Sequence, residues 1–586
     1  MELQRIRTGT IIAGLILLLA IGARFYRLGA APLSDFEAER ALQALQVARG
    51  EQVALGPGPA YPLLTGTLFS LFDESNFLAR LLPALAGSLL VILPLIFVTE
   101  IGLVPALVIT LGLALDPGLV AISRLAGGPI LALSLELLAV GFLLRRRLIL
   151  AGICAGLALL AGPAAVQGAV ILGVTYFAGK WLIRGPDWLP GGHPLEPVSR
   201  SDRNKGLVAG GAVVLAAGTL FFLFPQGLSS MAASIPAYLS GWLQPSGIPP
   251  MRLVAALIFY NPLVLVFGLL AAGRGWLGGD ARIKWLSLWA LIALLLTLVY
   301  PGRQVSDLVW VLVPLWTMAG IEIVRDLSVE KKDRLPVLGQ AALIMILLAL
   351  AWINLAGVSQ SAGDIQSIRL RWAVIGGTVL LGFVTTLLVS LGWTRQIALS
   401  GLAWGLVAGL GLFGFANLWN ATQVHPNGEQ ELWYPEPVTG QADLFVKTLG
   451  DLSMWRTGMR DTLDITVLSS QPSVRWALRN WPQARYLSGP LPGELPSVIV
   501  NTEGQPEPNL SAGYRGQDFA WWVYPAWQGA LPPDWARWLV FRAAPQQPVH
   551  LILWARADLF PGGVLGPEGG APAEQEQEAP LDSPTQ

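Results

Sequence analysis

The feature that most constrains this chain is the recurrence of long apolar stretches, which begin at residue 8 and continue to about residue 419. A transmembrane helix needs about 20 predominantly apolar residues, and we count roughly thirteen stretches of that length or slightly shorter. Only 13% of the residues are charged, against roughly 25% in soluble proteins. The sequence therefore predicts an α-helical polytopic membrane protein with about thirteen transmembrane helices. The stretches span residues 8–23, 76–97, 101–116, 127–144, 147–162, 164–183, 206–225, 252–273, 285–300, 305–324, 336–357, 371–392 and 397–419.

Charge and cysteine content exclude several kinds of site. The formal net charge is zero, so no basic excess indicates binding to nucleic acid. The single cysteine, Cys154, excludes an intramolecular disulfide and a metal centre built from cysteines. The chain has three histidines, so a histidine-rich metal centre is not expected either.

The distribution of lysine and arginine between the loops predicts an orientation. With a cytoplasmic N-terminus, the cytoplasmic loops carry about 18 Lys and Arg residues and the outer loops about 10, as the positive-inside rule requires. We interpret the first stretch as an uncleaved helix rather than a signal peptide. An odd number of spans then places the C-terminus outside. We therefore expect a multi-pass protein of the cell membrane with an extracytoplasmic C-terminal domain.

The first outer loop, residues 24–75, carries signals for two helices. Ser34 and Glu37 have the spacing of a capping box, which predicts a helix that begins at Asp35. The following residues place apolar side chains on one face, as in a helix that lies on the membrane interface. A Gly-Pro-Gly-Pro break at residues 56–59 separates this helix from a second apolar piece, residues 61–72.

Charged and aromatic residues return after residue 419, which predicts a second domain over residues 420–563. Its pattern indicates strands at 463–468, 497–501, 538–542 and 549–554 and helices at 442–452 and 474–480, as in a small α/β domain. Residues 564–586 are rich in Pro, Glu, Gln and Gly and predict a disordered tail. Residues 1–419 form the membrane domain in this scheme.

Motifs near the start of the chain resemble those of one superfamily of membrane proteins. The first membrane helix is followed by Arg24-Phe25-Tyr26-Arg27-Leu28, Ala31-Pro32-Leu33 and acidic residues that open a helix. Further along come Pro62-Leu63-Leu64, the run from Glu74 to Gly87, and Ile122-Ser123-Arg124. In this order they resemble the GT-C superfamily of polytopic glycosyltransferases. The closest likeness is to glycosyltransferase family 39, the protein-mannosyltransferase and aminoarabinose-transferase-like family, with its RgtA/B/C/D-like relatives. The outer domain more loosely resembles flippase-associated proteins of glycan assembly, through residues 514–519 and 553–556.

The resemblance implies an inverting hexosyl- or pentosyltransferase. Such enzymes take a sugar from a polyprenyl-phosphate donor in the membrane and pass it to an outer acceptor, which is a glycan, a lipid or a protein. A carboxylate in the first outer loop accepts the proton of the acceptor hydroxyl, and cations stabilise the departing lipid phosphate. Two other functions stay open. The chain is alternatively a catalytically degenerate relative that scaffolds glycan assembly or flipping, or a transporter, although we find no internal repeat.

Asp35 is the first candidate for the catalytic base, and Glu37 is the second. The predicted helix N-terminus favours the ionised carboxylate of Asp35. The family pattern has adjacent acidic residues before this helix; here Phe36 occupies the first of these positions and Glu37 the second. The alternative is that Glu37 only closes the capping box and Asp35 only complements the helix dipole. As a base, Asp35 should border a polar cavity that opens to lipid and outer solvent.

Asp116 is the candidate second carboxylate, because it lies before Pro117 at the predicted outer end of the third span. Some GT-C enzymes use an acidic residue in this region, with or without a divalent metal such as Mg²⁺ or Mn²⁺. Asp-Pro is also an ordinary turn sequence.

We assign Arg80, Arg124 and Arg303 to the lipid phosphate, because a guanidinium group matches phosphate oxygens. The alternative is that each arginine extends to lipid headgroups. Family members often carry a lysine near the end of the fifth span, whereas residues 160–165 contain none, which favours the degenerate relative.

Two other features need an explanation from the structure. Glu136 lies near the middle of an apolar stretch, a costly placement that usually marks a functional or paired group. The aromatic run at residues 521–527 either stacks on sugar rings or packs in a core.

Overall fold

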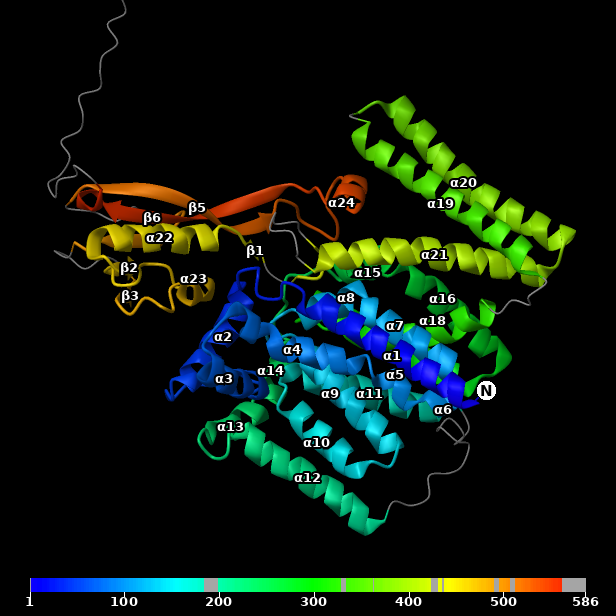
Figure 1. Ribbon diagram of the computed structural model, residues 1–586, viewed down its shortest axis with the longest axis horizontal. Coiled ribbons are helices and arrows are strands. Elements are labelled where there is room, and N and C mark those ends of the chain that lie inside the picture. Colours follow the sequence, from blue (N-terminus) through cyan, green and yellow to red (C-terminus); the bar gives the residue numbers. More distant parts are fainter. Residues whose placement is uncertain are drawn as a thin grey trace, which may run out of the picture. The chain divides into compact units, whose positions relative to one another are not determined.

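The computed structural model describes residues 2–183, 199–327, 333–361, 363–422, 431–434, 437–488, 495–505 and 512–560 (Figure 1). The predicted disordered tail, residues 564–586, lies outside the described residues. The helices of the first 300 residues are α1 (Glu2–Phe25), α2 (Asp35–Ala48), α3 (Ala60–Phe72), α4 (Asn76–Leu90), α5 (Leu93–Ile96), α6 (Val98–Ile101), α7 (Leu103–Leu115), α8 (Pro117–Ser123), α9 (Ile130–Leu144), α10 (Leu148–Leu159), α11 (Pro163–Leu182), α12 (Arg200–Gly218), α13 (Gln226–Ala232), α14 (Ser234–Ser240), α15 (Pro250–Tyr260), α16 (Pro262–Gly278) and α17 (Ala281–Val299).

Helices continue to residue 421, and strands occur after that point. The later helices are η1 (Val305–Leu308), α18 (Val309–Asp326), α19 (Arg334–Gln360), α20 (Ile365–Gly392), α21 (Arg395–Ala421), α22 (Ala442–Thr457), α23 (Pro472–Ala477), α24 (Trp535–Phe541) and η3 (Ala557–Leu559). The strands are β1 (Val438–Thr439), β2 (Ile465–Val467), β3 (Ala484–Tyr486), β4 (Val498–Thr502), β5 (Tyr514–Pro525) and β6 (Gln546–Arg556).

The chain forms two compact units. The first consists of Met1–Val438 and Tyr524–Gln547, and the second of Thr439–Val523 and Pro548–Gln586. The first unit contains the apolar helices, and the second contains most of the sheet.

The chain is a polytopic membrane protein, as predicted. In its described part, seven helices are long and apolar enough to cross a membrane, or up to nine if two bent helix pairs each form one span. Each of the thirteen predicted stretches is helical, but several form helices shorter than a bilayer. The helices α9 and α10, for example, have 15 and 12 residues, whereas a span needs about 20.

The two bent pairs change direction at a proline. The helices α7 and α8 meet at 55° across Asp116, and α15 and α16 meet at 95° across Asn261. Pro117 and Pro262 begin the second helix of each pair. Proline lacks an N–H and its ring blocks the preceding turn, so it begins a helix more readily than it continues one. The predicted span 252–273 is therefore two helices.

The two helices predicted in the first outer loop are present. Ser34 caps α2, its side chain accepts from the Glu37 amide at 3.4 Å, and the Glu37 side chain accepts from the Ser34 amide at 3.2 Å. The second apolar piece forms α3. The two helices pack closely at Gly66, where an added Cβ would lie 2.8 Å from the Ala44 carbonyl oxygen. The capping box thus positions the loop residues that form the candidate site.

The second unit is an α/β unit built on a six-stranded sheet with the order β1-β5-β6-β4-β2-β3. Strand β2 pairs in parallel with β3 and β4, whereas β4 and β6 are antiparallel. The predicted strands at 463–468, 497–501 and 549–554 and both predicted helices are present. Strand β5 was not predicted, because four successive exposed residues near its start hide the alternation that marks a strand.

Trp521 and Trp522 pack in the core of the second unit and do not form a sugar-binding face. Both are buried, and the Phe445 and Trp521 rings lie 5.3 Å apart. The Trp521 indole N–H donates to the Ser473 hydroxyl at 2.9 Å. Core packing, the second interpretation of this aromatic run, is therefore correct for these two residues.

The predicted strand at 538–542 is wrong, because these residues belong to α24 and its C-terminal cap. Aromatic and aliphatic residues favour a strand here, but Asp534 caps a helix by accepting from the Arg537 amide at 3.1 Å. Burial of Trp538 and Leu539 on one side of that helix then fixes it in the first unit.

Candidate active site

Glu37 and Arg80 form a buried ion pair between α2 and α4. Their side chains are 4% and 6% exposed. Arg80 Nε and Nη2 donate to the two carboxylate oxygens, each at 2.7 Å. Glu37 Oε1 also accepts from the Ala126 amide at 2.9 Å. The carboxylate therefore joins the start of α2 to α4 and to the loop after α8.

The remaining donors of Arg80 bind the first outer loop. Nη1 donates to the carbonyls of Leu28 and Ala31 at 3.2 and 2.8 Å, and Nη2 donates to the Pro32 carbonyl at 3.0 Å. A guanidinium has five N–H donors, and these contacts use all of them. This geometry does not support a direct contact of Arg80 with lipid phosphate, and it likewise favours a structural role for Glu37.

Asp35 differs from Glu37 in its burial. It is the first residue of α2 and is half-buried, whereas Glu37 is 3% exposed. On the same turn, the Arg40 guanidinium lies over the Phe36 ring at 3.7 Å from its centroid and donates to the Phe36 carbonyl. Asp35 is thus the more accessible carboxylate of the two. The polar cavity beside it stays a prediction.

Arg124 is held at the end of α1 by only one of its nitrogens. Its Nη1 donates to the Arg24 and Tyr26 carbonyls, each at 2.9 Å. No described residue accepts a hydrogen bond from Nε or Nη2, although the side chain is only 7% exposed. Arg124 therefore keeps donors for a ligand, as the prediction for this residue requires.

Tyr434 joins this cluster and was not found from the sequence. Its hydroxyl donates to the Ala421 carbonyl at 2.6 Å. Burial raises the pKa of Tyr434 well above its usual value, while the positive charges of Arg124 and Arg80 lower it. The phenol is therefore neutral and remains a donor beside two arginines. Residue 434 lies 310 positions after Arg124, and no local pattern connects the two.

Asp116 caps α8 and is fully buried. Its Oδ1 accepts from the Leu119 amide at 2.8 Å, and its Oδ2 accepts from the Trp316 indole N–H at 2.6 Å. Arg24 lies beside it and donates to the Leu113 and Ala114 carbonyls at the end of α7. These contacts support the turn interpretation of Asp116 and make a catalytic role less consistent with its geometry.

Arg303 lies in the loop before η1. Its Nη1 donates to the Ile248 carbonyl at 3.0 Å, and its buried Nε has no partner among the described residues. Helix η1 contacts α8, and Arg124 directly follows α8. Arg303 therefore lies just before η1 and Arg124 just after α8, and these two helices contact each other. The donors of Arg80 instead bind the first outer loop.

Two acidic side chains lie beside α11, and one of them, Asp307, belongs to η1, the helix that follows Arg303. Asp307 accepts from the Gln304 amide at 2.8 Å and has a side-chain hydrogen bond with Gln167. Glu136 Oε2 is buried without a hydrogen-bond partner in the described chain, and an added Cβ on Gly168 would collide with it. Gln304 and Asp307 have the spacing of a capping box, a local signal in the sequence that predicts the start of η1.

The donor set does not fit a divalent metal. Within the described ranges, no three His, Cys, Asp or Glu side chains come together in a way that could hold one. Both oxygens of Glu37 are already bonded to Arg80. We therefore derive no chemical step through Mg²⁺ or Mn²⁺.

Comparisons with known proteins bear on the fold. No protein-family model matches the sequence, and no curated protein matches it significantly. A solved structure of ArnT from Cupriavidus metallidurans bound to undecaprenyl phosphate is similar, with a TM-score of 0.50 and 14% identity over 82% of this chain and 86% of that one. A structure of archaeal oligosaccharyltransferase AglB from Archaeoglobus fulgidus, in complex with an inhibitory peptide and a dolichol-phosphate, has a TM-score of 0.42. It shares 12% identity over 81% of this chain and 64% of that one. The likeness to ArnT shows that the chain has the GT-C fold.

Proposed function

We propose that this chain, which has the GT-C fold, is an integral-membrane glycosyltransferase that uses a polyprenyl-phosphate-linked sugar. The acceptor is an extracytoplasmic glycan, lipid or protein. The similar structure of ArnT holds undecaprenyl phosphate, which supports a donor of the same chemical class. Bilayer lipid surrounds the apolar helices and delivers such a donor from the side.

One observation carries the proposal. The first outer loop brings a half-buried carboxylate, Asp35, to the start of the helix whose Glu37 accepts a hydrogen bond from the Ala126 amide, two residues after Arg124. Arg124 in turn keeps guanidinium donors that no described residue uses. A base and a phosphate ligand close together at the end of a membrane span are what transfer from a lipid phosphate needs.

The proposed reaction is a single displacement. The acceptor hydroxyl attacks the anomeric carbon, the bond from that carbon to the phosphate oxygen breaks, and the sugar configuration inverts. Asp35 accepts the hydroxyl proton, and the polyprenyl phosphate leaves with the bonding electron pair. Arg124 and Arg303 stabilise the phosphate charge, which is present both before and during the displacement.

A non-catalytic scaffold for glycan assembly or flipping is the second candidate. The observation that favours it is the mutual neutralisation of Glu37 and Arg80 in a buried pair. Glu37 occupies a position where the GT-C pattern has an acidic residue, and here its oxygens are committed to the fold.

A donor panel distinguishes the two candidates. We would incubate the purified full-length chain with radiolabelled polyprenyl-phosphate sugars, hexoses and pentoses, and measure both transfer and hydrolysis. Release of the sugar from at least one donor, abolished by Arg124→Ala, is expected of the enzyme. Binding of a donor without any release would support the scaffold, and neither binding nor release would contradict the proposed donor class.

A further inference from the structure

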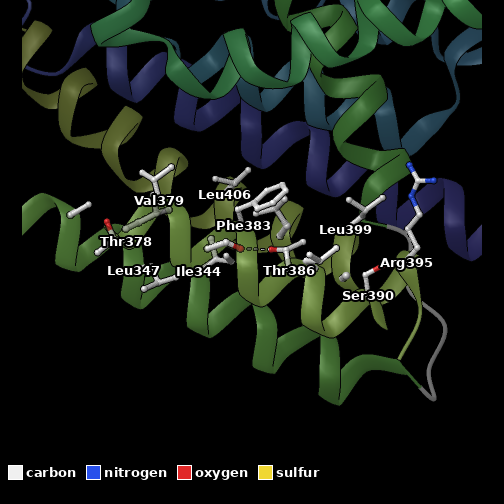
Figure 2. A pocket seen from close by; sticks show the side chains of 16 residues that line it. Ile344, Leu347, Thr378, Val379, Phe383, Thr386, Ser390, Arg395, Leu399 and Leu406 are labelled. Carbon is white, nitrogen blue, oxygen red and sulfur yellow. Dashed lines mark hydrogen bonds between the residues drawn. The ribbon is translucent and has the colours of Figure 1, made fainter. Parts of the chain in front are cut away.

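A groove with a volume of about 650 Å³ runs between α19, α20 and α21 in the first unit (Figure 2). Apolar side chains from all three helices line it, among them Leu347, Phe383 and Leu406. Among the described residues that line it, Thr378, Thr386 and Ser390 carry hydroxyl groups and Arg395 is the one charged side chain. The groove is thus apolar along its length.

The groove exists because the three helices pack unequally. Gly401, Gly405 and Gly409 recur every four residues on α21, and at Gly405 an added Cβ would lie 2.6 Å from the Ile344 Cβ. Small residues at this spacing let membrane helices approach closely. On α20, by contrast, an added Cβ on Gly382 would lie 3.7 Å from the nearest side-chain atoms of α19. Every residue of α20 is described, and Thr378 is the one that is buried. α20 therefore leaves space beside the α19–α21 pair.

Arg395 supplies a positive charge at one end of the groove. It is exposed, and no hydrogen bond or ion pair joins it to any residue in the described ranges. Figure 2 shows its side chain at the same end as Ser390 and Leu399, whereas Thr378 and Val379 lie at the other end. A cation at the mouth of an apolar groove matches a molecule with an anionic head and a hydrocarbon tail.

We propose that this groove binds one anionic phospholipid, with an acyl chain between the helices and the phosphate at Arg395. The wall of α20 from residue 378 to residue 390 is roughly 18 Å long at the helical rise per residue. One leaflet of the hydrocarbon core is roughly 15 Å thick, half of the full core. The groove therefore accommodates a tail from a single leaflet.

Arg395 lies far from the residues that we propose bind the phosphate of the sugar donor. Arg395 begins α21, and Ala421 at the other end of this helix accepts the hydrogen bond from Tyr434 beside Arg124. These ends are roughly 39 Å apart at 1.5 Å per residue, which approaches the full thickness of a bilayer. The groove thus opens to the leaflet opposite the candidate active site, and the proposal does not depend on the proposed function.

Photo-crosslinking in nanodiscs tests this lipid site. The full-length chain is placed in equal parts of phosphatidylglycerol and phosphatidylcholine, with a photoreactive acyl chain on one lipid at a time. Crosslinks should map to groove-facing residues of α20 and α21 and should favour phosphatidylglycerol. Arg395→Gln should lower that preference about five-fold, the effect of one cation near an anionic headgroup. The matched control is Arg369→Gln, which removes an exposed charge near the start of α20.

A second variant addresses the apolar part of the site. Gly382→Phe places a ring in the groove and should reduce groove crosslinks from both lipids at least several-fold. Each variant is compared only if it elutes from a size-exclusion column like the wild type, and the lipid preference is a ratio measured within one preparation. Equal losses in Arg395→Gln and Arg369→Gln, or unchanged crosslinks in Gly382→Phe, would overturn the proposal. Displacement by added polyprenyl phosphate, but not by phosphatidylglycerol, would show that the ligand is the carrier lipid instead.

Discussion

At the level of single residues, the three candidate arginines differ in how many of their donors the protein itself uses. Arg80 uses all five donors within the first outer loop and on Glu37. Arg124 uses one nitrogen, and Arg303 donates from Nη1 to a single carbonyl. An arginine whose donors are all bonded stabilises the fold, whereas one with spare donors is able to bind a phosphate. We therefore expect Arg124 and Arg303, rather than Arg80, to bind the donor phosphate.

Removing the charge of Glu37 should destabilise the protein. Glu37→Gln keeps a side chain that suits the capping box but leaves the buried Arg80 without its counter-charge, at a cost of about 3–5 kcal/mol. Thermal unfolding of the purified chain should show a clearly lower midpoint. Glu39→Gln, an exposed change on the same helix, is the control and should be neutral within about 0.5 kcal/mol. An unchanged midpoint together with lost activity would identify Glu37 as the base.

Removing the carboxylate of Asp35 should affect turnover and not stability. Asp35→Asn keeps the size of the side chain at the start of α2 but cannot accept a proton, so transfer should fall by about two to four orders of magnitude. Donor affinity should stay similar, because the acceptor proton moves only during the displacement. The measurement is kcat and KM with the donor identified from the panel. Wild-type turnover in this variant would rule out Asp35 as the base.

At the level of secondary-structure elements, a buried polar cluster fixes the C-terminal segment of the first unit to its helices. Arg542 pairs with Glu431 at 3.1 Å and donates to the Asn417 side chain at 2.6 Å. The Tyr260 hydroxyl donates to the same Glu431. The cluster joins α15, α21 and the residues after α24, and it explains why 524–547 belong to the first unit although they follow most of the second.

Arg542→Ala should release this segment. The change leaves Glu431 buried without its cation, and loss of one partner of a buried pair costs about 3–5 kcal/mol. Alanine retains the Cβ at a residue with φ of 53°, so backbone strain is unchanged. Limited proteolysis followed by mass spectrometry should show faster cleavage within 524–547. Arg537→Ala, on the exposed side of the same helix, should be cleaved like the wild type, and equal rates for all three proteins would contradict this role of the cluster.

At the level of the whole molecule, the loop charges predict how the chain crosses the membrane. A cysteine at Ser201 should be cytoplasmic and a tag at Gln586 extracytoplasmic. In a Cys154→Ser background, a membrane-impermeant maleimide should label Ser201→Cys only after the cells are opened. An antibody should reach the C-terminal tag in intact spheroplasts. Labelling of the residue-201 site in closed cells would show that the chain has the opposite orientation.

The sequence determined the class of the protein and the position of most of its elements. Hydrophobicity over a window of about 20 residues is a local property, so each predicted apolar stretch is helical in the structure. The Ser34 and Glu37 capping box likewise involves residues three positions apart, and α2 begins where that spacing predicted. The strand predicted at 538–542 failed because a cap at Asp534 and burial outweighed the preference of its aromatic and aliphatic residues.

Only the tertiary structure decided which of the candidate residues pair with each other. Glu37 binds Arg80 across 43 positions and the Ala126 amide across 89, and Arg542 reaches Asn417 across 125. No periodicity or short motif encodes such pairs, because they depend on how separate helices pack. Burial then sets the outcome, since a charge removed from water must find partners inside the protein. The sequence thus identifies the candidate carboxylates and arginines. Helix packing buries Glu37 and Arg80 as a pair and so distinguishes them from Asp35 and Arg124.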